Sequence, residues 1–184
     1  MSASAIHIHG YAIISDDDRI ADSNGRTPRS LRNEADWARF QHELDRADLV
    51  AIGRLGHQAN PNAKHRRRLV LSRGAAGLEQ RGEEWWWHPA ETPWREVTAM
   101  LLPDGGRVAV PGGQAVFDLF AEIGYEAFHL TRAHGVLLGA GRRLFSACER
   151  GASAESVLDG AGLRPAAPET IDAAANVTLT IWRR

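Results

Sequence analysis

Hydrophobic and polar positions along the chain predict strands that alternate with helices. Residues 6–15, "IHIHGYAIIS", begin with alternation and become continuously apolar, which is typical of a strand that enters a buried sheet. In residues 33–47 apolar side chains recur every three or four positions, which predicts an amphipathic helix. Residues 107–120, "RVAVPGGQAVFDLF", combine an apolar run, a Pro-Gly-Gly turn and a new helical spacing. They predict a strand, a glycine turn and a helix in direct succession.

The remaining segments continue this alternation. Strands are expected at residues 49–53, 67–72, 83–89, 127–133 and 176–182, and a short helix at 94–102. A long loop is expected at 16–30, turns at 54–62, and a surface excursion in the Ala-, Gly- and Pro-rich residues 149–169. We therefore predict a single α/β domain over residues 1–184, with a central, mostly parallel sheet flanked by helices and an antiparallel C-terminal hairpin.

The composition fits one globular domain. The chain has 184 residues, 43% of them hydrophobic, which is enough to build a core. No run approaches the roughly eighteen apolar residues that a membrane helix needs, and the first residues lack a signal-peptide core. A cytoplasmic protein without a membrane partner is therefore expected. The lone Cys148 cannot form an internal disulfide, and we interpret it as a reduced structural thiol.

Charge and histidine content narrow the classes of partner. A net charge of -1 argues against a surface that binds nucleic acid, so no nucleic-acid partner is expected. The basic cluster "KHRRR" at 64–68 is interpreted as a solvated loop. The alternative is that it binds a phosphate or carboxylate group of a small ligand. Strand alternation places His7 and His9 on one face, but no third ligand lies at suitable spacing. We therefore predict no metal site.

The ends of three predicted strands carry residues suited to phosphate. Ligands of such sheets bind beyond the carboxyl ends of the strands, where a glycine lets an anion approach the backbone. Gly112 and Gly113 fit this role, or they serve a tight turn only. "VAIGR" and "VLSR" add two arginines at further strand ends, and arginine pairs bidentately with phosphate. Each arginine taken singly is more typical of a solvated loop. Together they favour a dinucleotide with an extra phosphate, NADPH, although no G-x-G-x-x-G fingerprint is present.

The order of these motifs is similar to that of a known family. "AIISDDDRIAD", "DWARF", "VAIGR", "RRLVLSR", "VAVPGGQAVFDLF", "HLTRAHGVLLGAGRRLF" and "TLTIWRR" follow one another through nearly the whole chain. In this order they resemble the dihydrofolate reductase superfamily, including the reductase domain of the bifunctional deaminase-reductase of riboflavin synthesis. The phrase "GVLLGAGRRLF" looks especially like small bacterial proteins of the riboflavin branch.

The resemblance implies a set of residues that hold NADPH. Gly53 and Arg54 match the position where the adenosine phosphates dock, and Ser72 and Arg73 match the loop that reads the 2'-phosphate. A glycine turn under the pyrophosphate and two residues beside the nicotinamide complete the set: Gly112, Gly113, Gln114, Ala12 and Ile20.

The resemblance also implies a substrate side. Asp36 matches the carboxylate that grips the pterin ring and is the candidate catalytic residue, Thr131 matches its threonine partner, and Arg66 falls near the arginine that holds the folate tail. Asp36 has a second interpretation from the sequence alone. If Asn33 caps the helix, Asp36 lies at the third helical position, where an acid stabilises the helix by about 0.5–1 kcal/mol and has no role in catalysis.

The chain also departs from the family pattern. Arg29 stands where dihydrofolate reductases carry tryptophan, Gly56 replaces a threonine or serine, and Pro111 replaces the first glycine of the turn. We therefore predict an NADPH-dependent reductase that transfers hydride to a pterin, a pyrimidine or a related heterocycle. The alternative is a non-catalytic nucleotide-binding relative of the same fold. Relatives on the riboflavin branch are commonly dimers, so the resemblance also implies a homodimer.

Overall fold

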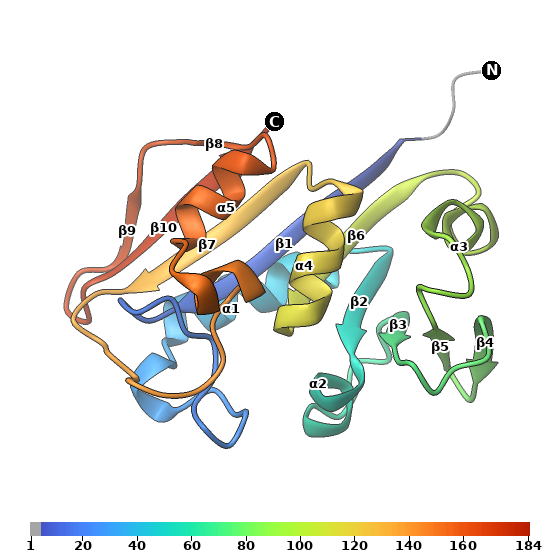
Figure 1. The fold of residues 1–184 in the computed structure, drawn as a ribbon, viewed down its shortest axis with the longest axis horizontal. Coiled ribbons are helices and arrows are strands. Elements are labelled where there is room, and N and C mark those ends of the chain that lie inside the picture. The colour runs from blue at the N-terminus through green and yellow to red at the C-terminus, as the bar shows by residue number, and fades with distance from the viewer. Residues whose placement is uncertain (1–4) are drawn as a thin grey trace.

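A computed structural model describes residues 5–184 as one ten-stranded sheet with helices on both faces (Figure 1). The strands are β1 (Ile6–Ile14), β2 (Leu49–Gly53), β3 (Arg68–Leu71), β4 (Leu78–Arg81), β5 (Glu84–Trp87), β6 (Gly106–Gly112), β7 (Ala127–Ala133), β8 (Arg164–Pro165), β9 (Glu169–Asp172) and β10 (Val177–Arg183). The helices are η1 (Arg29–Leu31), α1 (Glu34–Asp45), α2 (Arg54–Ala59), α3 (Trp94–Leu101), α4 (Gln114–Ile123), η2 (Ser146–Arg150) and α5 (Ala154–Gly160).

The sheet is parallel in its centre and antiparallel at its edges. The strand order is β4-β5-β3-β2-β6-β1-β7-β10-β8, and β9 also pairs with β10. All pairs from β5 to β7 along this order are parallel, whereas β4, β8, β9 and β10 pair antiparallel. The predicted mostly parallel sheet with an antiparallel C-terminal hairpin is confirmed.

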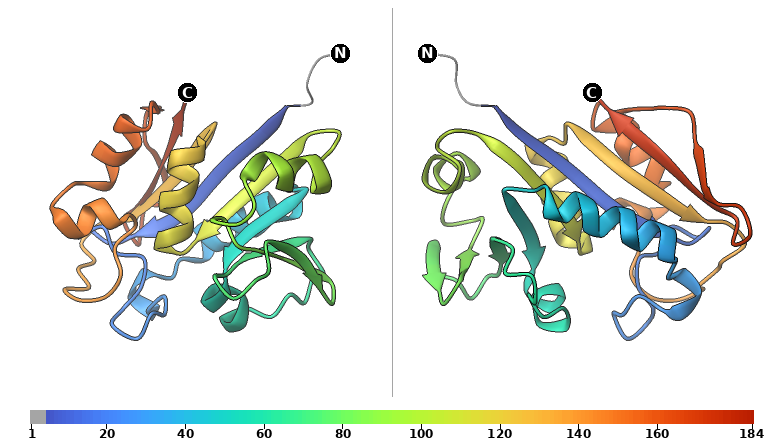
Figure 2. Two further views of the ribbon diagram at one scale, coloured as in Figure 1. Left: turned by 45° about the vertical axis from the view of Figure 1, so that its right-hand side comes forward. Right: turned by 180° about the vertical axis from the view of Figure 1, so that it is seen from behind.

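The helices cover the two faces unequally. In Figure 2, α1 lies on the face opposite to α4 and α5. The α4 face carries the main core, to which α3, α4 and α5 contribute Val97, Phe120 and Leu158, each fully buried. The α1 face has a smaller apolar cluster around Leu44 and Tyr11, and polar side chains occupy the rest of it. Strand alternation sends neighbouring residues of β1 and β7 to these two environments.

Helices α2 and α5 lie in segments where the sequence predicted no helix. Residues 54–59 form α2 rather than turns, because the helix is short and mostly exposed and so carries no apolar repeat. The excursion expected at 149–169 contains α5, which buries Ala154 and Leu158 and is capped by the Ser153 hydroxyl. The sequence did not predict this helix, because its composition is rich in Ala and Gly and it has only two buried side chains, four residues apart.

No helix within residues 5–184 is long and apolar enough to span a bilayer.

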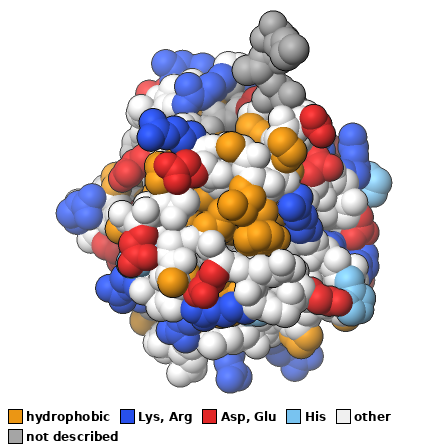
Figure 3. All heavy atoms as spheres, turned by 90° about the vertical axis from the view of Figure 1, so that its right-hand side faces the viewer, with side chains coloured by type: hydrophobic (Ala, Val, Ile, Leu, Met, Phe, Trp, Pro, Cys, Tyr) orange, Lys and Arg blue, Asp and Glu red, His pale blue; other side chains and the backbone are white. Residues whose placement is uncertain are grey.

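The end of the molecule formed by α3, β4 and β5 is shown in Figure 3, where hydrophobic side chains gather at the centre and charged side chains surround them. Partly buried hydrophobic residues of these elements include Leu78, Trp85 and Trp94, which pack against the main core.

Candidate functional site

The three predicted strand ends meet at one edge of the sheet. β3, β2 and β6 are adjacent and parallel, so Ser72, Gly53 and Gly112 end neighbouring strands. A Cβ atom on Gly53 would lie 3.8 Å from the backbone nitrogen of Gly113, which shows that the two glycine turns touch. Segments about sixty residues apart in the sequence therefore form one continuous backbone surface.

Gly112 and Gly113 have different local reasons to be glycine. Gly112 has a φ of 119°, and a Cβ there would come within 2.9 Å of the Phe117 ring. Gly113 has an extended backbone, and a Cβ there would meet nothing within 4 Å. The peptide bond between them is cis. Gly112 is thus required by the turn, whereas the space beside Gly113 is open at the first turn of α4, where helical N–H groups lack intrahelical acceptors.

Both predicted phosphate arginines are exposed. Arg54 Nη1 donates to Gln58 Oε1 at 3.3 Å along α2, and Arg73 follows β3. Neither guanidinium forms an ion pair with any carboxylate of residues 5–184. The Ser72 hydroxyl accepts from the Gly74 backbone at 3.1 Å and turns the chain after β3. The two positive charges therefore stand uncompensated beside the glycine turns.

The side chain of Gln114 has internal partners. Its Nε2 donates to the Arg143 carbonyl and to Glu149 Oε1, both at 3.1 Å. The segment after β7 is thereby tied to the start of α4. The amide nitrogen of this predicted cofactor residue is therefore engaged within the protein.

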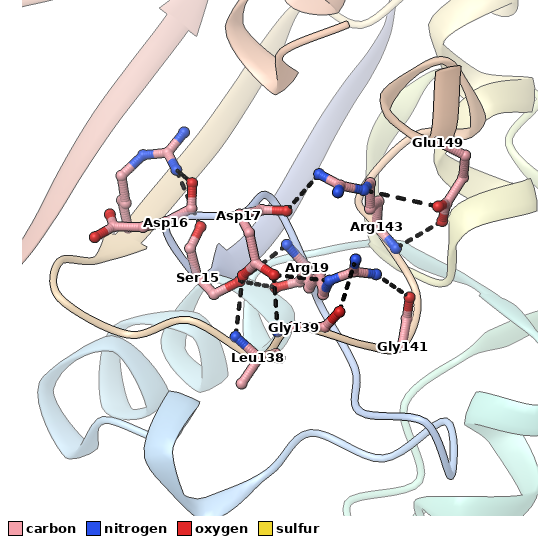
Figure 4. A network of polar contacts seen from close by, with 10 residues as sticks. Ser15, Asp16, Asp17, Arg19, Leu138, Gly139, Gly141, Arg143 and Glu149 are labelled. Atoms are coloured by element: carbon pink, nitrogen blue, oxygen red, sulfur yellow. Dashed lines mark hydrogen bonds and ion pairs between the residues drawn. The ribbon is translucent and has the colours of Figure 1, made fainter. Parts of the chain in front are cut away.

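The loop after β1 is clamped onto the same segment by a polar network centred on Asp17 (Figure 4). Asp17 accepts from the backbone of Leu138 at 3.1 Å and of Gly139 at 3.0 Å, and from Arg19 Nε at 2.8 Å. Burial opposes ionisation, but these bonds and one from Ser15 together lower the pKa of Asp17 well below its usual range. The network holds the loop in one place.

Ala12 and Ile20 lie at the two ends of this clamp. Ala12 is in β1 opposite Leu130 of β7, and the Ile20 backbone donates to the Arg142 carbonyl at 2.9 Å. Both side chains are partly buried against the main core. The clamp fixes Ile20 relative to β1, as a wall beside a ligand requires.

Asp36 and Thr131 meet on the opposite face of β7. Thr131 Oγ1 donates to Asp36 Oδ1 at 2.5 Å, which joins α1 to β7 across ninety-five residues of chain. Asn33 is the N-cap as predicted, and its side chain accepts from the Asp36 backbone at 3.0 Å. Burial raises the pKa of the Asp36 carboxyl, whereas the Thr131 bond and the charge of Arg39 lower it. Asp36 therefore lies in the first turn of α1, beside the Asn33 cap, and its carboxylate is bound by Thr131 of β7.

Arg66 is engaged inside the protein. Its guanidinium donates to Asp45 Oδ1 at 2.9 Å and 2.6 Å and to Gln41 Oε1 at 2.8 Å. Every side chain of the basic cluster at 64–68 has such a partner: Asp45 for Lys64 and Arg66, Glu83 for His65, the Leu101 carbonyl for Arg67 and the Asn60 carbonyl for Arg68. The two carboxylates compensate part of the positive charge of the cluster, and the bonds to Gln41, Leu101 and Asn60 hold its arginines against the protein.

A buried polar stack beside Asp36 escaped the sequence analysis. The His129 ring stacks on Tyr11 with centroids 4.6 Å apart and on His9 at 5.6 Å, and Arg39 Nη2 donates to His129 Nδ1 at 2.7 Å. His7 and His9 share one face as predicted, and both contact Glu126. Within residues 5–184 no group of three or more His, Cys, Asp or Glu side chains is arranged so that it could hold a metal ion. The available signal was the spacing: Arg39 is one turn after Asp36, and His129 is two residues before Thr131.

Comparison with known proteins identifies the fold. No family model and no curated protein sequence matches the chain. Among solved structures, a dihydrofolate reductase from Enterococcus faecalis complexed with NADP(H) and RAB-propyl superposes with a TM-score of 0.67 at 15% identity, over 97% of this chain and 96% of that one. The chain has the dihydrofolate reductase fold.

Two riboflavin-related structures share this fold. A protein described as a riboflavin biosynthesis protein from Shewanella sp. PV-4 gives a TM-score of 0.66 at 18% identity, over 97% of this chain and 99% of that one. A diaminohydroxyphosphoribosylaminopyrimidine deaminase/5-amino-6-(5-phosphoribosylamino)uracil reductase from Thermotoga maritima gives 0.64 at 17% identity, over 97% of this chain. The chain spans 56% of the length of the Thermotoga protein.

Proposed function

We propose that the protein is an NADPH-dependent reductase that transfers hydride to a pterin, a pyrimidine or a related heterocycle. The observation that carries the proposal is the juxtaposition of two half-sites on one sheet. An open glycine turn with two uncompensated arginines lies at the ends of β2, β3 and β6. A half-buried carboxylate held by Thr131 lies against β7. Two proteins with similar structures support this assignment: one is a dihydrofolate reductase complexed with NADP(H), and the other is described as a uracil reductase.

The residues at the strand ends fit a dinucleotide phosphate. The open space beside Gly113 would accept a pyrophosphate against the first turn of α4, which favours an anion. Arg54 and Arg73 would pair with the 2'-phosphate, and Ser72 would add a hydroxyl. Ala12 and Ile20 would wall the nicotinamide. When bound, NADPH supplies the hydride.

The acceptor side is assigned to Asp36. Its carboxylate would hold the amidine edge of a heterocycle while Thr131 fixes its orientation. Such a grip places the C=N or C=O bond of the acceptor for transfer and holds one proton of the ring at a defined oxygen.

The test compares two Gly→Ala variants. Gly113→Ala should keep the fold, because nothing lies within 4 Å of the new Cβ, and should weaken NADPH binding at least tenfold if a pyrophosphate occupies that space. Gly160→Ala is the matched control, since its Cβ is equally free and lies at the end of α5. Binding is measured by calorimetry, and NADPH oxidation is measured with a panel of pterins and pyrimidines. Equal NADPH affinity in both variants would remove the cofactor assignment.

The second candidate is a nucleotide-binding relative without catalysis. The internal pairing of Arg66 with Asp45 and the departures at Arg29 and Pro111 favour it. It predicts NADPH binding that Gly113→Ala weakens, without oxidation by any heterocycle of the panel. The homodimer implied by the resemblance and the cytoplasmic location expected from the composition stay predictions.

A further inference from the structure

Helix α1 is joined to β7 by two successive side-chain bonds. The first is Thr131 Oγ1 to Asp36 Oδ1 at 2.5 Å, and the second is Arg39 Nη2 to His129 Nδ1 at 2.7 Å. The spacing is three residues on the helix and two on the strand, so both bonds lie on the same faces of their elements. The carboxylate and the guanidinium are therefore neighbours on one helical face.

The second bond fixes the protonation state of the histidine. A guanidinium has only donors, so His129 Nδ1 must be the acceptor and the neutral ring carries its proton on Nε2. The ring is 6% exposed and is confined by Tyr11 and His9. A protonated ring could not accept the bond and would face the positive charge of Arg39. The neutral imidazole is thus a rigid anchor for the guanidinium.

We propose that Arg39 is a positioning residue for Asp36: the buried His129 ring holds its guanidinium on the helical face that carries the carboxylate, where a positive charge one turn away favours the carboxylate anion. The inference rests on the proposed function for its meaning in turnover. Burial disfavours the Asp36 anion, the Thr131 hydrogen bond opposes this effect, and the charge of Arg39 adds a smaller effect in the same direction as the Thr131 bond. Without Arg39 the carboxyl would stay protonated over a wider pH range and could not grip a cationic amidine edge.

The charges around this pair come from several elements. Asp36 is faced by Arg39 from α1 and by the non-titrating Thr131 from β7. His129 is faced by the charged or titrating side chains of Arg39 from α1, His9 and Tyr11 from β1, Arg107 from β6 and Arg183 from β10. All the ionised groups in this second set are cations. They favour the neutral ring and so reinforce the anchor.

The experiment is an NMR titration of the Asp36 side-chain carboxyl carbon. The Asp36 pKa should rise in Arg39→Gln, which removes the charge, and should be unchanged in Arg46→Gln, which removes an exposed arginine at the C-cap of the same helix. Arg39→Lys keeps the charge and should give a smaller rise than Arg39→Gln. His129→Leu, which frees the guanidinium, should also raise the pKa and serves if Arg39→Gln does not fold. An Asp36 pKa equal to the wild-type value in Arg39→Gln, or in His129→Leu in its place, would overturn the proposal.

Turnover then separates this inference from the proposed function. With any accepted heterocycle, the acid limb of kcat/KM for NADPH oxidation should move to higher pH in Arg39→Gln, with NADPH affinity unchanged. A raised carboxyl pKa without a moved limb would leave Arg39 as the positioning residue of Asp36 and would remove Asp36 from the reaction. An unmoved carboxyl pKa would overturn the role of Arg39 whether or not the protein is a reductase.

Discussion

The two faces of the central sheet are built from the same strands but do different work. Phe128 and Leu130 of β7 point to the α4 face and join an apolar core, whereas His129 and Thr131 point to the α1 face. Both sets are buried, yet the first is held by close packing and the second by directed hydrogen bonds. The difference indicates that the α4 face supplies stability, and that the α1 face gives up apolar area to hold charged groups in defined positions.

The largest difference between the faces should appear when an aromatic ring is deleted. Phe120→Ala in α4 removes a fully buried ring from the main core and should cost about 3–5 kcal/mol of unfolding free energy. Phe40→Ala in α1 removes a partly buried ring and should cost less than half of that. Urea denaturation of both variants measures the difference. Equal losses of unfolding free energy would contradict the conclusion that the α4 face contributes more to stability than the α1 face.

Acid should weaken the α1 face selectively. Burial and the nearby charge of Arg39 lower the pKa of His129 to about 3. As the pH falls, the His129 ring is therefore protonated in the unfolded chain before it is protonated in the folded protein. The neutral ring contributes its full share of the unfolding free energy above about pH 6.5. This share is lost as the pH falls towards 3, and the loss is about 2 kcal/mol at pH 5.

His129→Gln should flatten this dependence, because an amide oxygen still accepts from Arg39 and does not titrate. Unfolding free energies measured between pH 4 and pH 8 would show it. His65→Gln, at an exposed position whose side chain is hydrogen-bonded to Glu83, is the control and should leave the acid loss in place. A His129→Gln protein as acid-sensitive as the wild type would assign the loss to other groups.

Asp36→Asn tests whether the α1 face serves chemistry or only caps a helix. As a cap the amide still accepts a backbone hydrogen bond, so stability should change by no more than about 1 kcal/mol. As the grip on an acceptor, loss of the charge should reduce kcat/KM by roughly ten- to a hundredfold while NADPH affinity stays constant. Wild-type turnover with a slightly lower Tm would leave Asp36 as a structural acid.

The smallest effects should come from single hydroxyl groups, one on each face. Tyr11 donates to Glu43 on the α1 face at 3.1 Å, and Tyr125 donates to the Phe117 carbonyl on the α4 face at 3.1 Å. Each Tyr→Phe change should cost about 0.5–1.5 kcal/mol. Thermal melts of the two variants beside the wild type measure both losses.

Much of the fold could be predicted because its signals are local. The strands at 6–15 and 127–133, the helix that begins after Asn33 and the glycine turn before α4 each depend on neighbours within a few residues. α5 was missed because its Ala- and Gly-rich sequence shows too little apolar repeat. The Asp36–Thr131 pair was within reach only through the resemblance to a family.

The sequence by itself therefore determined most of the alternation of strands and helices, the Asn33 helix cap and the glycine turn before α4. The tertiary structure alone decided which side chains pair. Arg66 looked free until the fold placed Asp45 against it, and Arg39 gained its meaning from His129, ninety residues away. The reason is physical: backbone propensity depends on adjacent residues, whereas a buried hydrogen bond depends on the register and orientation with which distant segments pack.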